Sequence, residues 1–582
     1  MSVTLKVRSN EDDALLFWSI PQAIPGCRGF AIERKKTPPG GALVQGFLVN
    51  RIGFDTEGEA PVDEHGAALT KPSTEWPFQT FSWTDHDANS GDTVQYRVVP
   101  VIRNGSGTLE TMNDAASEWS PPVGLGNDPN ATFRPFFNRG FVISQFMARY
   151  LRENHLTLAA FKDQIGQPGG EGHEHNIRAF LSGDLRLAML EQLKEALDNS
   201  GEIFAALYEL DDDELINALC ALKGRAHVVL SNGSIQQASG ETAAEARTRD
   251  QNERARGLLL DAGVEVDADN RFISPGALGH NKFLVRTDSH QQPLVAWTGS
   301  TNWTKTGLCT QVNNGLLIAD TDIAAVYLTQ WHRLRDAKSA FPSSLVTANG
   351  TPTDFDSDPA GNPRASVRFT RTKDGGDLKA LEDAVDAATD GVLFLMFQPG
   401  AKGALGDVLT RVADQNLYLR GVVSTLPPAK DTEDAVEITL IDGSVQKTTQ
   451  YRIVQPVGVT TPMAFFAAEV TRSQFLSQVG FAIIHSKVLV IDPFTDHPVV
   501  ITGSHNFSST ASNANDENYI IIRGDRALAE AYAVNVFGAY THYRWRAYLA
   551  DNHATVGVLK DNDAWQTPKL KAQAKDLRFF GV

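Results

Sequence analysis

Cysteine, long apolar runs and an excess of basic residues are all missing from this sequence. The 582 residues contain three cysteines, Cys27, Cys220 and Cys309, which are too few and too scattered for a disulfide framework or a zinc site. They are typical of buried thiols in a reducing compartment. The formal net charge of −17 argues against a sequence-independent nucleic-acid clamp, because such a clamp needs a basic surface.

The sequence also shows no signal for secretion or membrane insertion. No apolar run approaches the length of a membrane-spanning helix, and the N-terminal residues MSVTLKVRSNEDDALLF lack the charged and apolar regions of a signal peptide. We therefore expect a cytoplasmic monomer that contacts membranes at most peripherally, and we expect no cofactor and no metal. His173 and His175 lie in the polar stretch GQPGGEGHEHN. Because they are not an i, i+4 helical pair, we interpret them as part of a solvated loop.

Residues 1–125 differ in character from the rest of the chain. Short alternating segments are separated by clusters of Gly, Pro, Asn and Asp, a pattern typical of a β-sandwich: VTLKV, LLFWSI, GFAIERK, QTFSWTDH and TVQYRVVPVI. We interpret Trp18 and Tyr96, which lie in these segments, as core residues. Together with the closing SEWSPP, the region resembles a fibronectin type III domain with a long insertion from Lys36 to Pro77.

After the linker GLGNDPN, the pattern changes to two similar α/β halves, residues 131–350 and 360–550. The first begins with the predicted helical region FNRGFVISQFMARYLRENH and continues with the helix LRLAMLEQLKEAL and the buried strand IFAALYEL; the second repeats this order with DLKALEDAVDAA and VLFLMFQPG. Two like halves predict a pair of mixed sheets packed together. Residues from about 427 to 460 are a predicted hairpin insertion that turns at Asp442-Gly443. Residues 551–582 form a C-terminal extension.

Two segments, 279–320 and 481–522, carry the same spaced set of polar residues between apolar runs. In each copy a His and a Lys stand two residues apart, Gly-Ser and an Asn follow a second apolar run, and an Asn or Glu comes 11 residues later. The members are His280, Lys282, Ser300, Asn302 and Asn313 in the first copy, and His485, Lys487, Ser504, Asn506 and Glu517 in the second. Alternate side chains of a strand share a face, so the His and Lys of each copy should point the same way. Such an internal repeat is far more specific than a single H-x-K.

The repeated motif resembles that of the phospholipase D superfamily, in which H-x-K-x4-D … G-S-x-N occurs twice per active site. The resemblance covers roughly residues 135–550. It implies two pseudo-twofold related mixed-sheet halves, here preceded by an all-β, immunoglobulin-like or fibronectin III sandwich. One departure is that the second copy has the expected Asp492, five residues after Lys487, whereas the first has Thr287 there and Asp288 one place later. The family's Asp is thought to be mainly structural, so the departure concerns the local turn.

The resemblance implies metal-independent phosphodiester hydrolysis through a phosphohistidine, with both motifs in one cleft. One histidine attacks, the other protonates the leaving group, and the Lys and Asn side chains stabilise the phosphoryl oxygens. We expect His485 to pair with Glu517, and His280 with Asn313. A carboxylate raises the pKa of an imidazole far more than an amide does, so this pairing would make His280 the nucleophile and His485 the acid/base. The same amide and acid asymmetry resembles tyrosyl-DNA phosphodiesterases.

The motifs predict a phosphodiester substrate and do not identify it. Our first choice is a phospholipase D that cleaves a phospholipid headgroup, because the chain is a two-copy, single-polypeptide enzyme with an acidic surface and a candidate apolar mouth. That mouth would be the run MAFFAAEV, Met463 to Val470, for which we favour packing in the core over lining a lipid-binding opening. A nuclease or other phosphodiesterase is the close alternative. A degenerate phosphate- or lipid-binding protein is a third, disfavoured because both copies retain His, Lys and Asn. We expect the N-terminal region to position the enzyme or cap its cleft, so residues from about 130 on should act without it.

Overall fold

The computed structural model describes most of the chain, in twelve stretches and a few isolated positions between 399 and 415. The stretches are 2–54, 70–141, 156–168, 176–266, 270–357, 363–373, 375–397, 417–425, 437–441, 449–452, 484–551 and 559–582. The histidine pair His173 and His175, residues 142–155 of the predicted helical region and the apolar run from Met463 to Val470 lie outside these stretches.

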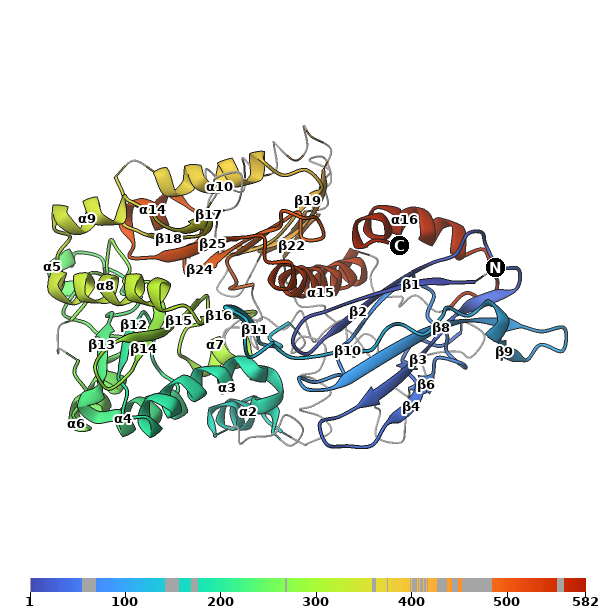
Figure 1. Ribbon diagram of the computed structural model, residues 1–582, viewed down its shortest axis with the longest axis horizontal. Helices are drawn as coiled ribbons and strands as arrows, with labels where there is room; N and C mark the ends of the chain where they lie inside the picture. The colour runs from blue at the N-terminus through green and yellow to red at the C-terminus, as the bar shows by residue number, and fades with distance from the viewer. Residues whose placement is uncertain are drawn as a thin grey trace.

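The N-terminal region is all-β, as predicted (Figure 1). Its strands form two main antiparallel sheets and one short pair. One sheet has the order β1 (Thr4–Ser9), β2 (Ala14–Ser19), β7 (Ser82–Asp85); the other has β10 (Val123–Gly124), β8 (Thr93–Arg103), β3 (Cys27–Thr37), β4 (Val44–Phe47), with β9 (Leu109–Thr111) also on β8; the short pair is β5 (Val49–Asn50) and β6 (Lys71–Pro72). Trp18 and Tyr96 are fully buried, in agreement with their interpretation as core residues. The assignment to the fibronectin type III family stays a prediction.

The first α/β half is built on a six-stranded mixed sheet. Its order is β11 (Phe133–Phe137), β16 (Asn314–Ile318), β15 (Pro293–Gly299), β14 (Lys282–Thr287), β12 (Ile203–Leu207), β13 (Ala226–Leu230). All neighbours are antiparallel except β12 and β13. The helices are α2 (Leu158–Gly166), α3 (Ile177–Asp198), α4 (Asp213–Leu222), α5 (Ala243–Ala246), α6 (Glu253–Asp261), α7 (Lys305–Cys309), α8 (Thr321–Ala337) and α9 (Ser343–Asn349).

The second half repeats this sheet and adds strands at both edges. The order is β17 (Thr353–Ser357), β18 (Pro363–Phe369), β25 (Asn518–Arg523), β24 (Val499–Gly503), β23 (Val488–Ile491), β19 (Gly391–Phe397), β20 (Tyr418–Thr425), β21 (Glu437–Ile441), β22 (Thr449–Arg452). In spatial order, the six strands from β18 across to β20 reproduce the six strands from β11 across to β13 in the first half. Both sets end in a single parallel pair. The helices whose bounds are described are α10 (Gly376–Asp386), α14 (Ser509–Ala514), α15 (Arg526–Asp551) and α16 (Gln566–Phe580). The predicted pair of mixed sheets is confirmed.

Two sequence predictions differ from this topology. The strand β11 was missed: the predicted helical region starts at Phe137, which is instead the last residue of this edge strand, paired with Asn314 of β16. In the insertion, β21 and β22 are antiparallel as predicted, but Leu440 pairs with Thr449. A two-residue turn at Asp442-Gly443 would not allow that register, so this detail of the hairpin was wrong.

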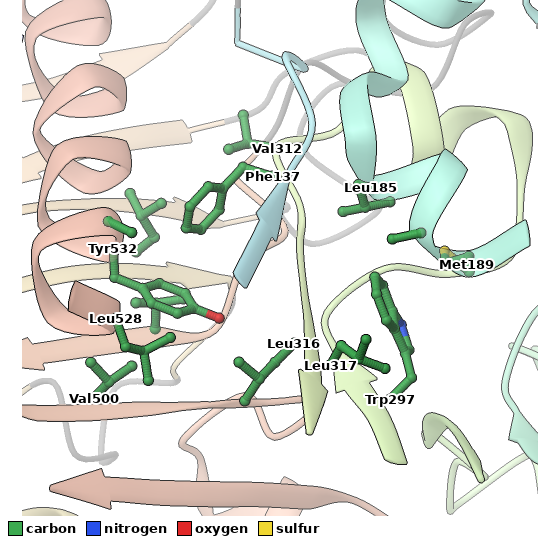
Figure 2. Packing of buried hydrophobic residues seen from close by; sticks show 14 of the residues in the cluster. Phe137, Leu185, Met189, Trp297, Val312, Leu316, Leu317, Val500, Leu528 and Tyr532 are labelled. Atoms are coloured by element: carbon green, nitrogen blue, oxygen red, sulfur yellow. The ribbon is translucent and has the colours of Figure 1, made fainter. Parts of the chain in front are cut away.

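The halves pack through equivalent aromatic contacts. Tyr532 of α15 meets Phe137 of β11 edge to face with ring centroids 5.0 Å apart, and Tyr327 of α8 meets Phe369 of β18 at 5.4 Å. Figure 2 shows Phe137 and Tyr532 side by side, with Leu316 of β16 directed toward them, while Leu317 lies toward Trp297 and α3. Each helix that follows a motif therefore packs its Tyr against the equivalent strand of the other half, β11 or β18.

The N-terminal region is joined to the rest of the chain by buried polar contacts. Glu11 accepts a hydrogen bond from the backbone N–H of Phe137 at 2.6 Å, and Asp12 forms an ion pair with Arg139 at 2.9 Å. Arg139 is 4% exposed. The turn between β1 and β2 therefore completes the edge of the first half.

The C-terminal helix α16 also packs on the N-terminal region (Figure 1). Phe580 stacks on Phe17 of β2 with centroids 4.2 Å apart, and the carboxamide of Gln573 accepts from the N–H of Phe81 at 3.0 Å. The two ends of the chain are thus held together.

Candidate active site

The two motif histidines lie in equivalent extended segments just before β14 and β23. Each segment forms a parallel bridge with the other half, Gly279 to Asp516 and Val312 to Ile484. The backbone N–H of His280 donates to the carbonyl of Asp516 at 3.0 Å, and that of His485 to Val312 at 2.9 Å. His280 is therefore placed beside Glu517, the residue after Asp516, and His485 is placed beside Asn313, the residue after Val312.

The hydrogen bonds of the histidines are consequently crossed between the halves. Nδ1 of His280 lies 2.7 Å from Oε2 of Glu517, and Nδ1 of His485 lies 2.9 Å from Oδ1 of Asn313. The sequence prediction that each histidine pairs within its own copy was wrong. The reason is tertiary: the parallel bridges join each histidine segment to the partner half. All four side chains are buried.

The Gly-Ser of each motif holds the partner of the histidine. Ser300 donates to Oδ1 of Asn313 at 2.7 Å, and Ser504 donates to Oε2 of Glu517 at 2.8 Å. The preceding Gly299 has φ +145°, and a Cβ there would lie 2.4 Å from the carbonyl oxygen of Asn314, so no larger residue fits. The amide nitrogen of Asn313 donates to the carbonyl of Gly307 at 2.8 Å, which directs its oxygen toward the imidazole.

The two lysines lie in equivalent positions. Each ammonium donates to the carbonyl of the histidine two residues earlier, at 2.7 Å for Lys282 and 2.6 Å for Lys487. Aromatic rings support both pairs. The ring of Tyr208 is 4.9 Å from the Lys282 nitrogen and 4.7 Å from the imidazole of His280; Phe397 lies 5.2 Å from the Lys487 nitrogen and 5.0 Å from the imidazole of His485.

Burial and mutual repulsion disfavour positive charge on these groups. Burial lowers the pKa of Lys282 to about 7 and that of His280 to about 4, even though Glu517 acts in the opposite direction on both. Burial lowers the pKa of Lys487 well below its usual value, and Lys282 lowers it further. The pKa of His485 is lowered well below its usual value by burial, Lys487 and Lys282. Lys282 of the first motif thus repels positive charge on Lys487 and His485 of the second, and an anion bound between these groups would relieve that repulsion.

Glu517 is the carboxylate that His280 contacts. Burial alone would raise its pKa, but His280, His505 and Lys282 together hold the pKa of Glu517 below its usual value. Its second oxygen accepts from the amide of Asn515 at 3.2 Å. Glu517 thus accepts hydrogen bonds at both oxygens, from His280 and Ser504 at one and from Asn515 at the other.

The motif asparagines occupy the loops after β15 and β24. Asn302 donates through Nδ2 to the carboxylate of Glu209 at 2.6 Å. Asn506 is half-buried, and its Oδ1 has no hydrogen-bond partner among the described residues. Among the described residues, Asn506 forms no hydrogen bond with the other motif residues.

Asp492 acts away from the histidines. Its carboxylate accepts from the backbone N–H groups of Thr389, Asp390 and Gly391 at 2.7 to 2.9 Å, and so holds the turn before β19. In the first copy Asp288 instead accepts from the N–H groups of the following turn, at 2.8 and 2.9 Å. The departure from the motif thus changes a turn at the far end of the strand.

Sequence reasoning missed Tyr208, Phe397 and Glu209. The two aromatic residues occupy corresponding places at the ends of IFAALYEL and VLFLMFQPG, so the internal repeat could have found them. Glu209 is not part of the repeated motif. The one sequence feature that points to it is its position just after a buried strand.

The fold and this geometry define a two-half α/β protein with one pseudo-twofold site to which each half contributes a His–Lys pair. The chain matches the family profile described as "Cardiolipin synthase, PLD-like domain" over residues 189–335 and 427–536. One matched segment lies in each half, so the chain resembles the phospholipase D superfamily in both of its halves. Among the described helices, none combines the length and the apolar character needed to cross a bilayer.

Two curated relatives match short stretches of the chain. The protein named phospholipase D from Rickettsia felis is 51% identical over 53 residues, which are 9% of this chain and 24% of the relative. The phospholipase D from Rickettsia prowazekii is 48% identical over 59 residues, 10% of this chain and 26% of that protein. The chain thus covers about a quarter of each relative. Among solved structures, phosphatidylserine synthase from Haemophilus influenzae is 10% identical, with a TM-score of 0.38, and the match covers 69% of this chain and 94% of that chain.

Proposed function

We propose that the protein is a metal-independent phosphodiesterase that works through a phosphohistidine formed on His280. The observation that carries this proposal is the crossed pair of hydrogen bonds, from His280 to Glu517 and from His485 to Asn313. Since Nδ1 of each ring donates to an oxygen, Nε2 of each ring is the nitrogen available for chemistry.

The charge of each partner suits one role. When Nε2 of His280 attacks phosphorus, the bond from phosphorus to the leaving oxygen breaks and the ring becomes positive, a charge that the carboxylate of Glu517 stabilises. His485, protonated on Nε2, gives that proton to the leaving oxygen and becomes neutral, which suits the uncharged Asn313. Water then attacks phosphorus, its proton passes to His485, and the electrons of the P–N bond return to His280.

These roles are the ones the sequence predicted, but they now rest on a different argument. The carboxylate belongs to the nucleophile, where it compensates the charge of the covalent intermediate. The acid receives its proton when the substrate binds, since an anion between the halves raises the pKa of the surrounding cations. With the anion bound, each protonated lysine donates one of its three N–H groups to a described acceptor, the carbonyl of its own histidine, and two are left for the phosphoryl oxygens.

We propose a phospholipid headgroup ester as the substrate. The acidic chain disfavours the polyanionic alternative, and both curated relatives are named phospholipase D. Every role in the two steps above is filled by a side chain, so turnover should not depend on added metal.

The test compares headgroup release from phospholipid vesicles with nicking of plasmid DNA, both in EDTA. We expect headgroup release, abolished in His280→Ala and retained in the control His290→Ala, because His290 lies exposed in the turn between β14 and β15. Plasmid nicking without lipid cleavage would overturn the substrate, and loss of all activity in EDTA would overturn metal independence.

A further inference from the structure

A second carboxylate, Glu209, lies at the site and is not used by the chemistry above. It follows β12 directly after Tyr208, whose ring packs on His280 and Lys282. Its Oε2 accepts from Nδ2 of Asn302 at 2.6 Å. Glu209 therefore touches one of the phosphate-binding side chains that we propose.

The carboxylate of Glu209 is incompletely satisfied. A carboxylate offers about four acceptor positions, and Glu209 receives the short bond from Asn302 and a long one of 3.4 Å from Gln251. Among the described residues, no Lys or Arg nitrogen lies within 4.0 Å of it. Burial raises the pKa of Glu209, while Lys282 and Lys487 oppose that rise from a distance. Free acceptor positions thus remain next to the phosphate-binding groups.

The surroundings of Glu209 open toward solvent on a polar side. Glu209 itself is partly exposed, and Gln251 and Ser234 next to it are exposed. The carboxamide oxygen of Gln251 accepts from the N–H of Ser234 at 2.8 Å. A substrate group that leaves the phosphate on this side meets an anion and polar groups.

The pseudo-twofold relation shows that the shared chemistry does not require this charge. Phe397 takes the place of Tyr208 in the second half, with the same contacts to its own His485 and Lys487. In the sequence the residue after Phe397 is Gln398, whose structure lies outside the described residues. The first half thus adds a negative charge at a position where the second half has an amide residue.

We propose that Glu209 selects phosphodiesters whose alcohol carries a hydrogen-bond donor, an ammonium or hydroxyl group, and rejects those with a second anion near the reacting phosphate. This inference rests on the proposed function and narrows its substrate class. Amino-alcohol and polyol headgroups meet the requirement. A nucleic acid does not, because its next phosphate would bring a second negative charge near Glu209.

The experiment uses four 2-substituted ethyl p-nitrophenyl phosphates that differ in one group: ammonium, hydroxyl, methyl or carboxylate. The value of kcat/KM is measured for each substrate with the full chain, and phosphorus NMR of the products shows which alcohol leaves. We expect the ammonium compound to exceed its methyl isostere about 10- to 100-fold, the range for a hydrogen bond between charged groups, with the carboxylate compound slowest.

Glu209→Gln should level this series, whereas an equal loss for all four substrates would overturn the proposal and leave Glu209 as a positioning residue for Asn302. Gln251→Lys, at an exposed position, is the second variant and should lower the preference for ammonium without loss of the fold. Lack of preference in the unmodified protein would also overturn the proposal.

Binding of the four corresponding methyl esters, measured by calorimetry, separates this inference from the proposed hydrolysis. If no ester is cleaved but the ammonium ester binds best and Glu209→Gln removes that preference, hydrolysis fails and the selectivity of Glu209 stands. Equal binding of all four esters would overturn the selectivity.

Discussion

Replacing Glu517 by Gln tests the proposed division of labour most directly, because it changes the charge at His280 and almost nothing in shape. The carboxylate of Glu517 accepts three hydrogen bonds, from His280, from Ser504 and from the amide of Asn515. A glutamine has one acceptor oxygen. With that oxygen toward His280, its NH2 group meets the NH2 of Asn515, whose own oxygen is already used by the N–H of Leu278 at 3.0 Å.

The expected loss follows from these contacts. A hydrogen bond to a charged group contributes about 1.5–3 kcal/mol, against about 1 kcal/mol for a neutral one, and a buried donor without an acceptor costs about 1–3 kcal/mol. The penalty falls on the transition state to the extent that the ring of His280 becomes positive there. We expect a loss of about 2–4 kcal/mol, or about 30- to 1,000-fold in kcat, with little change in KM.

The assay is pre-steady-state release of p-nitrophenol from an activated diester, whose leaving group needs no proton. Glu517→Gln should slow the first turnover itself. His485→Ala should instead show a burst followed by stalled turnover, with the phosphoryl group trapped on His280, and His280→Ala should show neither. Mass spectrometry of quenched protein locates the modification. A burst of normal rate in Glu517→Gln, or a phosphorylated peptide that contains His485, would refute the assignment.

Three further predictions concern charge and packing. Binding of dimethyl phosphate, whose charge is constant between pH 5 and 10, should weaken as pH rises above about 7, because Lys282 must then take up a proton to bind the anion; calorimetry across pH should show this slope, reduced in Lys282→Met. Phe137→Ala should lower the free energy of unfolding by about 3–5 kcal/mol in urea titrations, because the ring is 2% exposed and packs on Tyr532. A fragment that begins at residue 126 should fail to fold, judged by circular dichroism, because it leaves the buried Arg139 without Asp12, a loss of about 3–5 kcal/mol; a folded, active fragment would show that the N-terminal region is dispensable.

The last of these predictions reverses what the sequence suggested about the N-terminal region. Its alternating strands and core aromatic residues could be predicted from the sequence because they depend on local periodicity. The contact of Glu11 with Phe137 was not, since it joins residues 126 positions apart through a turn with no recognisable motif. The strand β11 was missed for a similar reason: FRPFF contains Pro135, and only its pairing with β16 makes it a strand.

In the site, too, the features that depend on local spacing were predictable from the sequence, and those that depend on how the halves pack were not. The motif spacing identified both His–Lys pairs and both partner residues, because these are fixed along single strands. It did not show which partner each histidine takes, since that depends on how the halves pair, and His280 and Glu517 are 237 positions apart. The sequence placed the carboxylate on the wrong histidine, so its pKa argument for the two roles had the wrong basis, and the assignment of those roles stays a proposal.

The crossed contacts also explain why two unequal copies belong to one chain. A half that stood alone would leave its histidine without the residue that orients it, because Glu517 serves His280 and Asn313 serves His485. Two identical halves would give both histidines the same partner. The proposed reaction, however, needs one ring stable as a cation in the covalent intermediate and the other stable as a neutral base. A carboxylate in one copy and an amide in the other supply that difference while the strands, lysines and serines remain equivalent.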